Sequence, residues 1–467
     1  MTTGATASYT EDRRREDESP EDLLALLIAG ASTEPHRVGE IGIVPSGGAT
    51  LGRGAGEGGL RITFVRQRPG RNEATPPLGG AGLSRDQIRV VLRADRLEVE
   101  LTGRAPLTHL DTDVERCVLR VGDAITLRGQ LTLVCVRRPV VLPRLAHFPE
   151  DAMGAFGEVD RFGTLGESPS AWATRDRVAF AAQSNGHALF FGESGTGKEL
   201  AARAVHGLSA RRAKTFIARN AATLPRGLID AELFGSAKNY PNAGMQERLG
   251  LVGEADGGTF FLDEIAELPS ELQSHLLRVL DADGEYQRLG DASPRRSNFV
   301  LLGATNREPD ALKHDLLARF PVRVQLPALR EHVDDLPLLV RHLMMRAAKK
   351  SPEIAERFLA DVDGVIHPRV NHRLLCALLD YGYPSNVREL DSILWQAMAA
   401  SPSDTLMGSP ALFQSLRPTP EPTTELTAAR IREELALHGN SMTQTARSLG
   451  LPSRYSLYRW MKKLGVD

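Results

Sequence analysis

The chain has 467 residues, a length that accommodates about three domains of roughly 150 residues each. Hydrophobic residues make up 42% and charged residues 25%, and the net charge of -2 excludes a chain-wide basic field for nucleic acid, so any such surface must be local. No apolar run approaches the roughly 18 residues of a membrane helix, and the 3 scattered cysteines favour a reduced, cytoplasmic protein that does not enter membranes.

The amino-terminal region contains a charged tail, a short apolar run and a series of β-rich runs. Residues 1–20 carry mixed charges without apolar periodicity and are predicted to be a disordered tail, and residues 21–30 (EDLLALLIAG) are predicted to form a short helix. Short β-rich runs with turns between them follow at 89–93, 97–101, 117–121, 124–127 and 131–136. This spacing predicts an all-β sandwich, and we place the first domain at residues 21–138.

Two segments of this domain resemble the phosphate-binding loops of the forkhead-associated (FHA) domain. They are Leu51-Gly52-Arg53 and Leu83-Ser84-Arg85. The resemblance implies that Arg53 and Ser84, with Arg85 beside them, hold a phosphothreonine of a partner protein, because the planar guanidinium fork suits phosphate. The family's histidine three places after the serine is Gln87 here, and its Asn-Gly loop is missing from residues 103–111. Phosphothreonine binding and protein docking by an altered FHA fold therefore both stay open.

A glycine-rich stretch dominates the middle of the chain. Residues 139–162 contain several prolines without a clear period and are predicted to be a linker, after which a second domain begins near residue 163. An apolar run at 187–191 precedes the stretch and a helical run at 199–209 follows it. The stretch itself consists of Gly192, Glu193, Ser194, Gly195, Thr196, Gly197, Lys198 and Glu199.

The order of strand, glycine-rich loop and helix is typical of a nucleotide-phosphate site. Successive N–H groups of such a loop point at phosphate oxygens, the helix N-terminus adds its positive dipole end, and Lys198 adds a point charge. Glu199 stands where Ser or Thr usually holds Mg²⁺, so the metal must rely on another carboxylate and on water. We expect ATP and Mg²⁺ as cofactors; the alternative is a chance glycine turn before a helix.

Two later apolar runs end in polar residues of the kind that hydrolysis requires. Residues 257–262 lead to Asp263, which can hold Mg²⁺ through water, and to Glu264, which can polarise an attacking water. Residues 299–304 lead to Thr305 and Asn306, whose amide can orient water or the γ-phosphate. Asn306 can also be read as a helix cap or turn residue.

Here the chain resembles bacterial sigma-54-dependent transcriptional activators, which are AAA+ ATPases. The shared motifs, in the family's order, are GESGTGKE, ELFG at 232–235, GGTFFLDEIAELP, ATNR at 304–307, LPALRE at 326–331 and YPSNVREL at 383–390. The resemblance covers about residues 163–400 and implies an α/β P-loop core at 163–331 and a helical lid at 332–402. It also implies a ring, usually a homo-hexamer, with ATP at the subunit interfaces and RNA polymerase with sigma-54 as partner.

The resemblance implies roles for further residues. Asn220 matches the asparagine that restrains the catalytic glutamate, Arg388 matches the sensor arginine of the lid, and Arg319 matches the arginine finger. The family usually has a second arginine six places before the finger, where this chain has Lys313, which keeps the charge but not the planar fork. Arg319 and Arg388 can also be read as solvated helix charges.

The rest of the chain divides into lid helices, a linker and a small basic unit. Lid helices are predicted at 335–347, 353–362, 372–380 and 386–400, and the Pro/Ser/Thr-rich residues 403–424 are predicted to be a linker. Residues 425–467 have helical runs at 428–437, 443–449 and 454–464 and a local net charge of +3, from seven basic and four acidic residues.

This carboxyl-terminal unit, residues 425–467, resembles the Fis-type helix-turn-helix. Recognition helices present their amino-terminal residues to base edges in DNA, and a local basic surface suits phosphate contacts. The predicted base contacts are Arg454, Tyr455, Ser456 and Tyr458, and the predicted phosphate contacts are Arg459 and Lys462. The alternative is a small helical docking module.

The loop after ELFG departs from the family. Where the family has Gly-Ala-Phe-Thr-Gly-Ala, whose aromatic and threonine residues meet sigma-54, this chain has Asn239-Tyr240-Pro241-Asn242-Ala243-Gly244. Pro241 stands at the phenylalanine position, and proline stiffens the loop because it fixes φ and removes a donor. Either the loop engages an altered site on sigma-54, or the protein regulates by other contacts.

The sequence thus predicts a multidomain protein with three folded parts. These are an all-β FHA-like sandwich, an α/β AAA+ P-loop ATPase with a helical lid, and an all-α helix-turn-helix. The predicted function is ATP-dependent transcription regulation, with DNA bound by the last part. The alternative is a sigma-54-independent DNA-binding regulator that uses nucleotide-gated assembly and FHA-mediated docking. A metabolic P-loop kinase would give no reason for the lid motifs.

Overall fold

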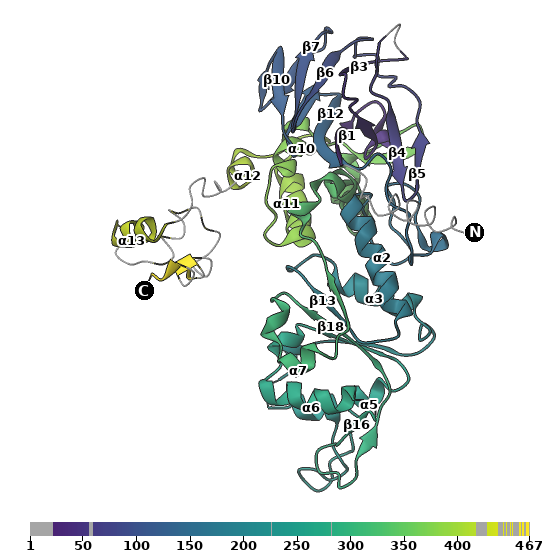
Figure 1. Ribbon diagram of the computed structural model, residues 1–467, viewed down its shortest axis with the longest axis vertical. Coiled ribbons are helices and arrows are strands. Elements are labelled where there is room, and N and C mark those ends of the chain that lie inside the picture. The colour runs from purple at the N-terminus through teal and green to yellow at the C-terminus, as the bar shows by residue number, and fades with distance from the viewer. Residues whose placement is uncertain are drawn as a thin grey trace, which may run out of the picture.

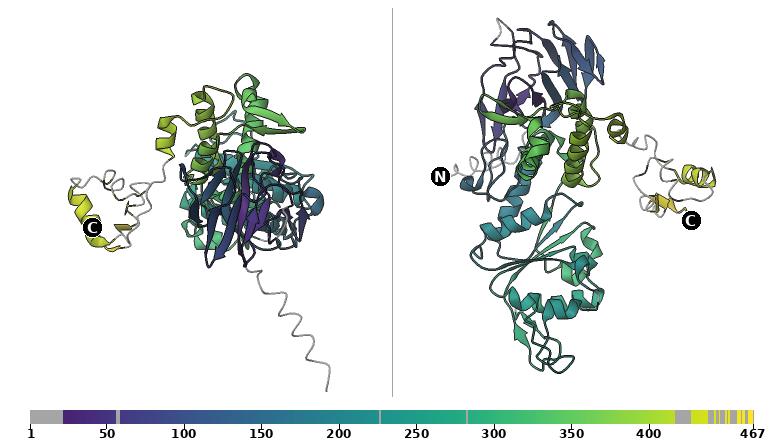
Figure 2. Two further views of the ribbon diagram at one scale, coloured as in Figure 1. Left: turned by 90° about the horizontal axis from the view of Figure 1, so that it is seen from above. Right: turned by 180° about the vertical axis from the view of Figure 1, so that it is seen from behind.

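The computed structural model describes residues 22–55, 59–225, 227–281, 283–416 and 427–437, and single residues beyond them at 442, 445, 449, 451, 457, 458, 460, 461 and 464–466. A β-sandwich, a helical lid and an α/β core follow one another along the long axis (Figures 1 and 2). Within the described part of the chain, no helix has the length and apolar character needed to cross a lipid bilayer.

The amino-terminal β-sandwich, residues 22–138, consists of two packed sheets. The larger has the strand order β5-β4-β2-β1-β12-β11-β8-β9, and the smaller has the order β10-β7-β6-β3. The strands are β1 (Leu23–Ala31), β2 (Ile41–Ile43), β3 (Ala49–Leu51), β4 (Phe64–Arg68), β5 (Arg71–Ala74), β6 (Ile88–Arg93), β7 (Arg96–Leu101), β8 (Leu107–His109), β9 (Thr112–Asp113), β10 (Arg116–Leu119), β11 (Ala124–Leu127) and β12 (Leu131–Arg138). The predicted β-rich domain is therefore present.

The prediction of a short helix at residues 21–30 is wrong, because this run forms strand β1. Leu24, Leu26 and Ile28 point into the sandwich core, and the residues between them belong to a cluster shared with the lid. A strand that is buried on both faces has a continuous apolar run, which periodicity alone does not distinguish from a short helix.

The α/β core contains a parallel sheet with the strand order β14-β15-β18-β13-β19. Its strands are β13 (Ala188–Phe191), β14 (Phe216–Asn220), β15 (Thr259–Asp263), β18 (Val300–Thr305) and β19 (Val322–Gln325). Helices α2 (Pro169–Gln183) and α3 (Lys198–Leu208) pack in one apolar cluster with the sheet, and α4 (Ile229–Phe234), α5 (Leu251–Glu254), α6 (Ser270–Leu280) and α7 (His314–Leu317) pack in another. Because the strands are parallel, their carboxyl ends meet at one edge.

The segment predicted to be a linker, residues 139–162, is instead packed against the core. Phe148 and Ala152 are buried beside Ala179 of α2, and the Asp176 carboxylate accepts hydrogen bonds from the backbone N–H groups of His147 (2.7 Å) and Phe148 (3.0 Å). The prolines here mark an irregular, ordered path, with a short 3₁₀ turn at Glu150–Ala152.

The lid contains α8 (Leu336–Lys350), α9 (Pro352–Ala355), α10 (His372–Leu379), α11 (Asn386–Ala400) and α12 (Pro410–Ser415). The helix predicted at 353–362 is confirmed only at its start, where α9 and a 3₁₀ turn at Glu356–Phe358 lie; it is wrong from residue 359 onward, because β20 (Leu359–Val362) and β21 (Val365–Pro368) form a hairpin there. Its two turn residues, Asp363 and Gly364, have φ values of 54° and 78°, as an Asp-Gly turn favours.

The helical lid also extends beyond its predicted end at residue 402. Leu406, Leu412 and Leu416 are buried in the lid core, and α12 begins with Ser409 as its cap and Pro410 in its first turn. We therefore define the lid as residues 332–416. The described part of the predicted 403–424 linker is folded, and residues 417–424 lie outside the described residues.

The outer face of the larger sandwich sheet packs on the lid (Figure 1). The shared cluster includes Leu27 and Val136 from the sandwich and Leu339 and Leu378 from the lid, all at most 8% exposed. A side-chain carbon at Gly30 of β1 would lie 2.9 Å from Leu375, so the two parts approach closely. Sandwich and lid therefore share one apolar core.

Candidate functional site

The predicted phosphate loop lies at the carboxyl edge of the parallel sheet, between β13 and α3. Gly192, Gly195 and Gly197 have φ values of 148°, 82° and 92°, which are readily available only to glycine. At Gly195 a side-chain carbon would lie 2.3 Å from the carbonyl oxygen of Ser385 in the lid. The loop therefore depends on glycine both for its curl and for the approach of the lid.

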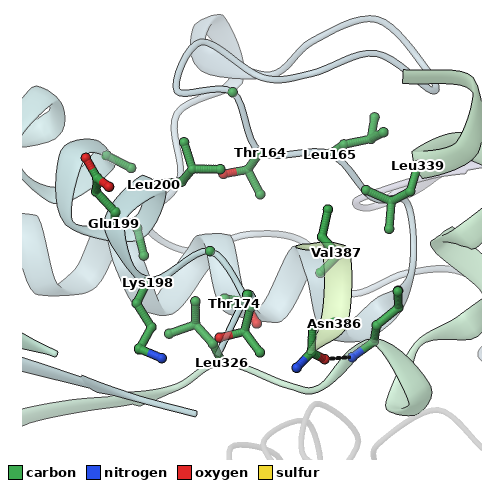
Figure 3. A pocket seen from close by; sticks show the side chains of 18 of the residues that line it. Thr164, Leu165, Thr174, Lys198, Glu199, Leu200, Leu326, Leu339, Asn386 and Val387 are labelled. Atoms are coloured by element: carbon green, nitrogen blue, oxygen red, sulfur yellow. Dashed lines mark hydrogen bonds between the residues drawn. The ribbon is translucent and has the colours of Figure 1, made fainter. Parts of the chain in front are cut away.

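A cavity of about 640 Å³ lies between this loop and the lid (Figure 3). Lys198 borders it from the core, Asn386 and Val387 border it from the lid, and Thr164 and Leu165 form part of its wall. Asn220, Asp263, Glu264 and Arg388 also line it. Its volume lies in the range of small-molecule and cofactor sites.

The Lys198 ammonium group is held inside the curl of the loop. Its Nζ donates hydrogen bonds to the carbonyl oxygens of Gly192 (2.8 Å) and Glu193 (2.9 Å). Burial lowers the pKa of Lys198, while Glu264 and Asp263 oppose that shift. The loop thus places one cation at the amino end of α3, as the sequence predicts.

The two acids lie side by side at the end of β15. The Asp263 carboxylate accepts hydrogen bonds from Asn220 Nδ2 (3.2 Å) and from the backbone N–H of Glu264 (3.0 Å). The Glu264 carboxylate accepts one from the backbone N–H of Asn306 (3.2 Å). The implied restraint of Glu264 by Asn220 is therefore not what the structure contains, because Asn220 holds Asp263, and Asn306 contacts Glu264 through its backbone.

These acids fit the chemistry of a magnesium site. The described residues contain no group of three or more metal-ligating His, Cys, Asp or Glu side chains. Mg²⁺ is commonly bound by one or two carboxylates together with substrate phosphates and water, and Asp263 and Glu264 can supply that share. Glu199 also lines the cavity, and its exposed carboxylate pairs with Arg203 of the same helix at 2.8 Å.

Polar side chains of the lid and of the segment just before it, residues 326–331, bind the phosphate loop. Arg388 Nη1 donates to Ser194 Oγ at 2.7 Å, and Asn386 Nδ2 donates to the Ser194 carbonyl at 2.9 Å. Arg330 Nη1 and Nη2 donate hydrogen bonds to the two oxygens of the Glu193 carboxylate, at 2.9 and 2.7 Å, and this pairing lowers the pKa of Glu193. The predicted sensor Arg388 thus lies at the cavity.

Sequence reasoning missed Asn386 and Arg330 as site residues. Asn386 is fully buried, and its Oδ1 accepts a hydrogen bond from the backbone N–H of Leu329 at 2.7 Å. It therefore links the lid both to the phosphate loop and to the LPALRE segment at residues 326–331. The only available signal was that both residues lie inside the motifs LPALRE and YPSNVREL.

The predicted arginine finger does not reach the cavity of its own chain. Arg319 follows α7, pairs with Asp281 at 2.5 Å and is absent from the cavity lining. Lys313, at the position of the family's second arginine, donates to Ser274 Oγ at 2.7 Å. Neither side chain therefore lines the cavity of its own chain.

The candidate phosphopeptide residues are brought together at one end of the sandwich. The backbone N–H of Arg53 donates to the Ser84 carbonyl at 2.9 Å, and Ser84 Oγ accepts from the backbone N–H of Arg104 at 2.9 Å. Gln87 is fully buried, with its side chain bound to Ser84 (3.0 Å) and Ala105 (2.7 Å). The residue at the family's histidine position thus links two loops, and Arg85 lies next to Ser84.

The structure describes little of the predicted DNA contacts. Arg454, Tyr455, Ser456, Arg459 and Lys462 lie outside the described residues, and Tyr458 is exposed. Helix α13 (Ala428–Leu437) supplies Ile431 and Leu435 to an apolar cluster that also contains Leu457 and Met461. This region therefore has a small core of its own.

The altered loop at residues 239–244 lies at the end of the molecule near β16 (Glu285–Tyr286; Figure 1). Asn239 Oδ1 accepts a hydrogen bond from the backbone N–H of Gly244 at 2.9 Å, and the Tyr240 ring lies against Gly290. Tyr240 and Met245 keep about two fifths of their surface exposed. The loop therefore presents apolar surface to solvent.

Residues 164–323 match the family described as the Sigma-54 interaction domain. The formate hydrogenlyase transcriptional activator of Salmonella typhimurium strain SL1344 is 32% identical over 329 residues, which are 67% of this chain and 45% of that protein. The anaerobic nitric oxide reductase transcription regulator NorR of Aeromonas hydrophila is 32% identical over 378 residues, 74% of this chain and 72% of that protein.

Among solved structures, NtrX from Brucella abortus in complex with ATP is similar, with a TM-score of 0.46 and 26% identity over 68% of this chain and 71% of that chain. The chain spans less than half the length of the Salmonella relative. The matched domain contains the phosphate loop, both acids, Asn306 and Arg319. With the similarity to NorR, these findings show that the chain belongs to the family of sigma-54-dependent transcription regulators.

Proposed function

We propose that the chain is an ATP-hydrolysing transcription regulator of the sigma-54 activator type. One observation carries the proposal: the phosphate loop with Lys198, the acids Asp263 and Glu264, and the lid residue Arg388 meet around one cavity. Phosphoryl transfer to water needs a phosphate cradle, charge neutralisation and a group that orients the water, and this set supplies all three.

Each residue has a distinct part in the proposed reaction. The N–H groups of the loop and the amino end of α3 bind the phosphates, and Lys198 adds positive charge beside them. Glu264, held by the backbone of Asn306, orients and polarises the attacking water. Asp263, which Asn220 fixes by a hydrogen bond, would hold Mg²⁺, and the bound ion would supply charge neutralisation on the phosphates.

Assembly would complete the site. The family implies a ring, usually a homo-hexamer, in which Arg319 of one copy reaches the γ-phosphate bound by its neighbour. The 2.5 Å pair with Asp281 must open for that contact. Lys313 would add positive charge near the same phosphate, but it lacks the bidentate fork of arginine and would therefore stabilise the phosphate less than a second arginine.

DNA binding is assigned to residues 425–467. The local charge of +3 and the separate apolar cluster around Ile431 support a small basic domain. In this assignment Arg454, Tyr455, Ser456 and Tyr458 face base edges, and Arg459 and Lys462 face phosphates.

In the first candidate function, movement driven by ATP hydrolysis acts on RNA polymerase that contains sigma-54. The alternative is sigma-54-independent regulation by nucleotide-gated assembly and docking of the sandwich. It is favoured by Pro241 and Asn242, which replace the family's phenylalanine and threonine in an exposed loop. The sandwich would take a phosphothreonine protein through Arg53, Ser84 and Arg85.

The test is the ATPase rate of the full chain against its concentration, with and without promoter DNA. The proposal predicts that the ATPase rate per chain rises with protein concentration, because Arg319 acts on the nucleotide of a neighbouring copy. With promoter DNA this rise should occur at a lower protein concentration, because several copies bind to the same DNA. ATP turnover that stays at background at every concentration would refute the enzymatic proposal. Turnover without open-complex formation by sigma-54 polymerase would favour the alternative.

A further inference from the structure

Residues 163–168 form a wall of the cavity and are held from several sides. Thr164 and Leu165 face the cavity, and Glu167 and Ser168 lead into α2. From behind, Arg175 of α2 donates to the carbonyl oxygens of Gly166 and Thr164, each at 2.9 Å. The position of this wall therefore depends on fixed hydrogen bonds.

The sandwich contributes two of these supports. Arg68, the last residue of β4, pairs with the Glu167 carboxylate at 2.8 Å and lies over the Trp172 ring, 5.0 Å from its centre. Arg138, the last residue of β12, donates to the Glu167 carbonyl at 2.8 Å and pairs with Asp334 at 2.7 Å. The Arg138 side chain is 1% exposed and the Arg68 side chain 8%.

The lid supplies the opposing charges. Asp334 and Asp335 come directly before α8, and Asp335 accepts hydrogen bonds from the backbone N–H groups of Glu167 (2.6 Å) and Ser168 (2.9 Å). His332, which lines the cavity, lies 3.2 Å from Asp335. Three carboxylates, Glu167, Asp334 and Asp335, thus meet beneath the cavity wall.

The sandwich arginines compensate this buried negative charge. Burial raises the pKa of Glu167, and Arg68 opposes the shift; burial likewise raises the pKa of Asp334, and Arg138 opposes it. Removing one partner of a buried pair leaves an uncompensated charge, which is strongly unfavourable. The sandwich thus supplies charge compensation that the lid and the wall need, in addition to the hydrogen bonds from Asp335 and Arg175.

We propose that Arg138, together with Arg68, is a positioning residue of the nucleotide site, so that the sandwich is a working part of the ATPase and not a detachable module. The inference rests on the proposed function, because it assumes that the cavity binds nucleotide. By thermodynamic linkage, bound nucleotide then strengthens the packing of the sandwich on the lid by the same factor by which that packing strengthens nucleotide binding. A sandwich ligand that shifted Arg138 would change nucleotide affinity.

The apolar interface offers a contrasting explanation. Leu27, Val136, Leu339 and Leu378 could hold the sandwich in place by themselves. In that case Arg138 would contribute to stability only, and a folded variant would bind nucleotide normally. Nucleotide affinity, measured separately from stability, distinguishes the two explanations.

The experiment uses the full chain with Arg138→Gln and a fluorescent ADP analogue. We expect the dissociation constant and KM for ATP to rise about tenfold, with kcat changed less than about twofold, because the wall moves while the reacting groups stay. Adding Asp334→Asn should bring the dissociation constant back to within about threefold of the wild type, since the uncompensated charge is then gone.

The matched control is Asp111→Asn, which removes the exposed ion pair with Arg373 across the same interface. Asn tolerates the positive φ of 60° at this position, and we expect unchanged nucleotide binding. If Arg138→Gln does not fold, Arg138→Lys is used in its place. We expect this variant to bind the ADP analogue about threefold more weakly than the wild type, because lysine cannot donate in two fixed directions.

The outcomes separate this inference from the proposed function. Failure of the wild type to bind the analogue would refute the nucleotide site itself. Normal binding by a folded Arg138→Gln or Arg138→Lys variant, even with a lower melting temperature, would overturn the positioning role. A double variant no better than Arg138→Gln would overturn it as well.

Discussion

Phosphate binding is proposed for two regions of the molecule, and these regions are built differently. The loop at residues 192–198 lies in a cavity, with Lys198 only 8% exposed and the lid bound to Ser194 through Arg388 and Asn386. The loops around Arg53 and Ser84 lie at an exposed end of the sandwich and are linked from below by the buried Gln87. Electrostatic interactions strengthen as water is excluded, so we expect the cavity to bind phosphate far more tightly than the exposed loops.

The largest expected effect is a loss of nucleotide affinity in the cavity. Lys198→Ala removes the cation at the amino end of α3, and nucleotide affinity should fall by about a hundredfold or more, as expected when a buried charge-assisted contact is lost. Calorimetric titration with ATP measures it, and Lys214→Ala, an exposed lysine of the same core, is the matched control. Affinity equal to that of the control would contradict the assignment.

A smaller effect is expected where the lid meets the loop. Arg388→Ala removes a charge-assisted hydrogen bond to Ser194 and the implied contact with nucleotide, so KM should rise about tenfold. Steady-state kinetics measures this change. Arg388→Lys keeps the charge and should recover part of the loss; an unchanged KM in Arg388→Ala would mean that the lid contact plays no part in binding.

The smallest effect concerns the sandwich. Arg53→Ala should weaken binding of a phosphothreonine peptide by about fivefold, because an exposed charge pair contributes roughly 1 kcal/mol or less. Fluorescence anisotropy with phosphorylated and unphosphorylated peptides measures it, and Arg93→Ala on β6 of the same sandwich is the control. Equal binding of both peptides by the wild type would leave only the docking function.

The comparison also shows what sequence can predict. The phosphate loop and the two acids follow strands of the parallel sheet, so their motifs and spacing could be recognised in the sequence. Arg388 lies on the lid helix α11 and was assigned by the family resemblance alone. Local patterns failed where a surface is shared: β1 reads as a helix because Ala25 and Leu27 pack on the lid while Leu24 and Leu26 pack in the sandwich. The Asp363-Gly364 hairpin was predictable from its turn and was overlooked.

Contacts between distant segments carried no sequence signal that could be read. Arg138 and Asp334 are far apart in the chain, and each alone reads as an ordinary surface charge, yet Arg138 is buried and Asp334 largely so, with side chains 1% and 12% exposed. The link between Asn220 and Asp263 likewise depends on the pairing of β14 with β15, which places them opposite each other. Motifs identified these residues but not their partners.

The most direct test of ATP hydrolysis in the cavity is Glu264→Gln, with bound ATP and released phosphate measured in the same samples of the full chain. The substitution keeps the shape of the side chain and its contact with Asn306 but removes the carboxylate that polarises water. The account predicts ATP affinity within about threefold of the wild type and turnover lower by roughly a hundredfold or more. Near-normal turnover in Glu264→Gln would contradict the account.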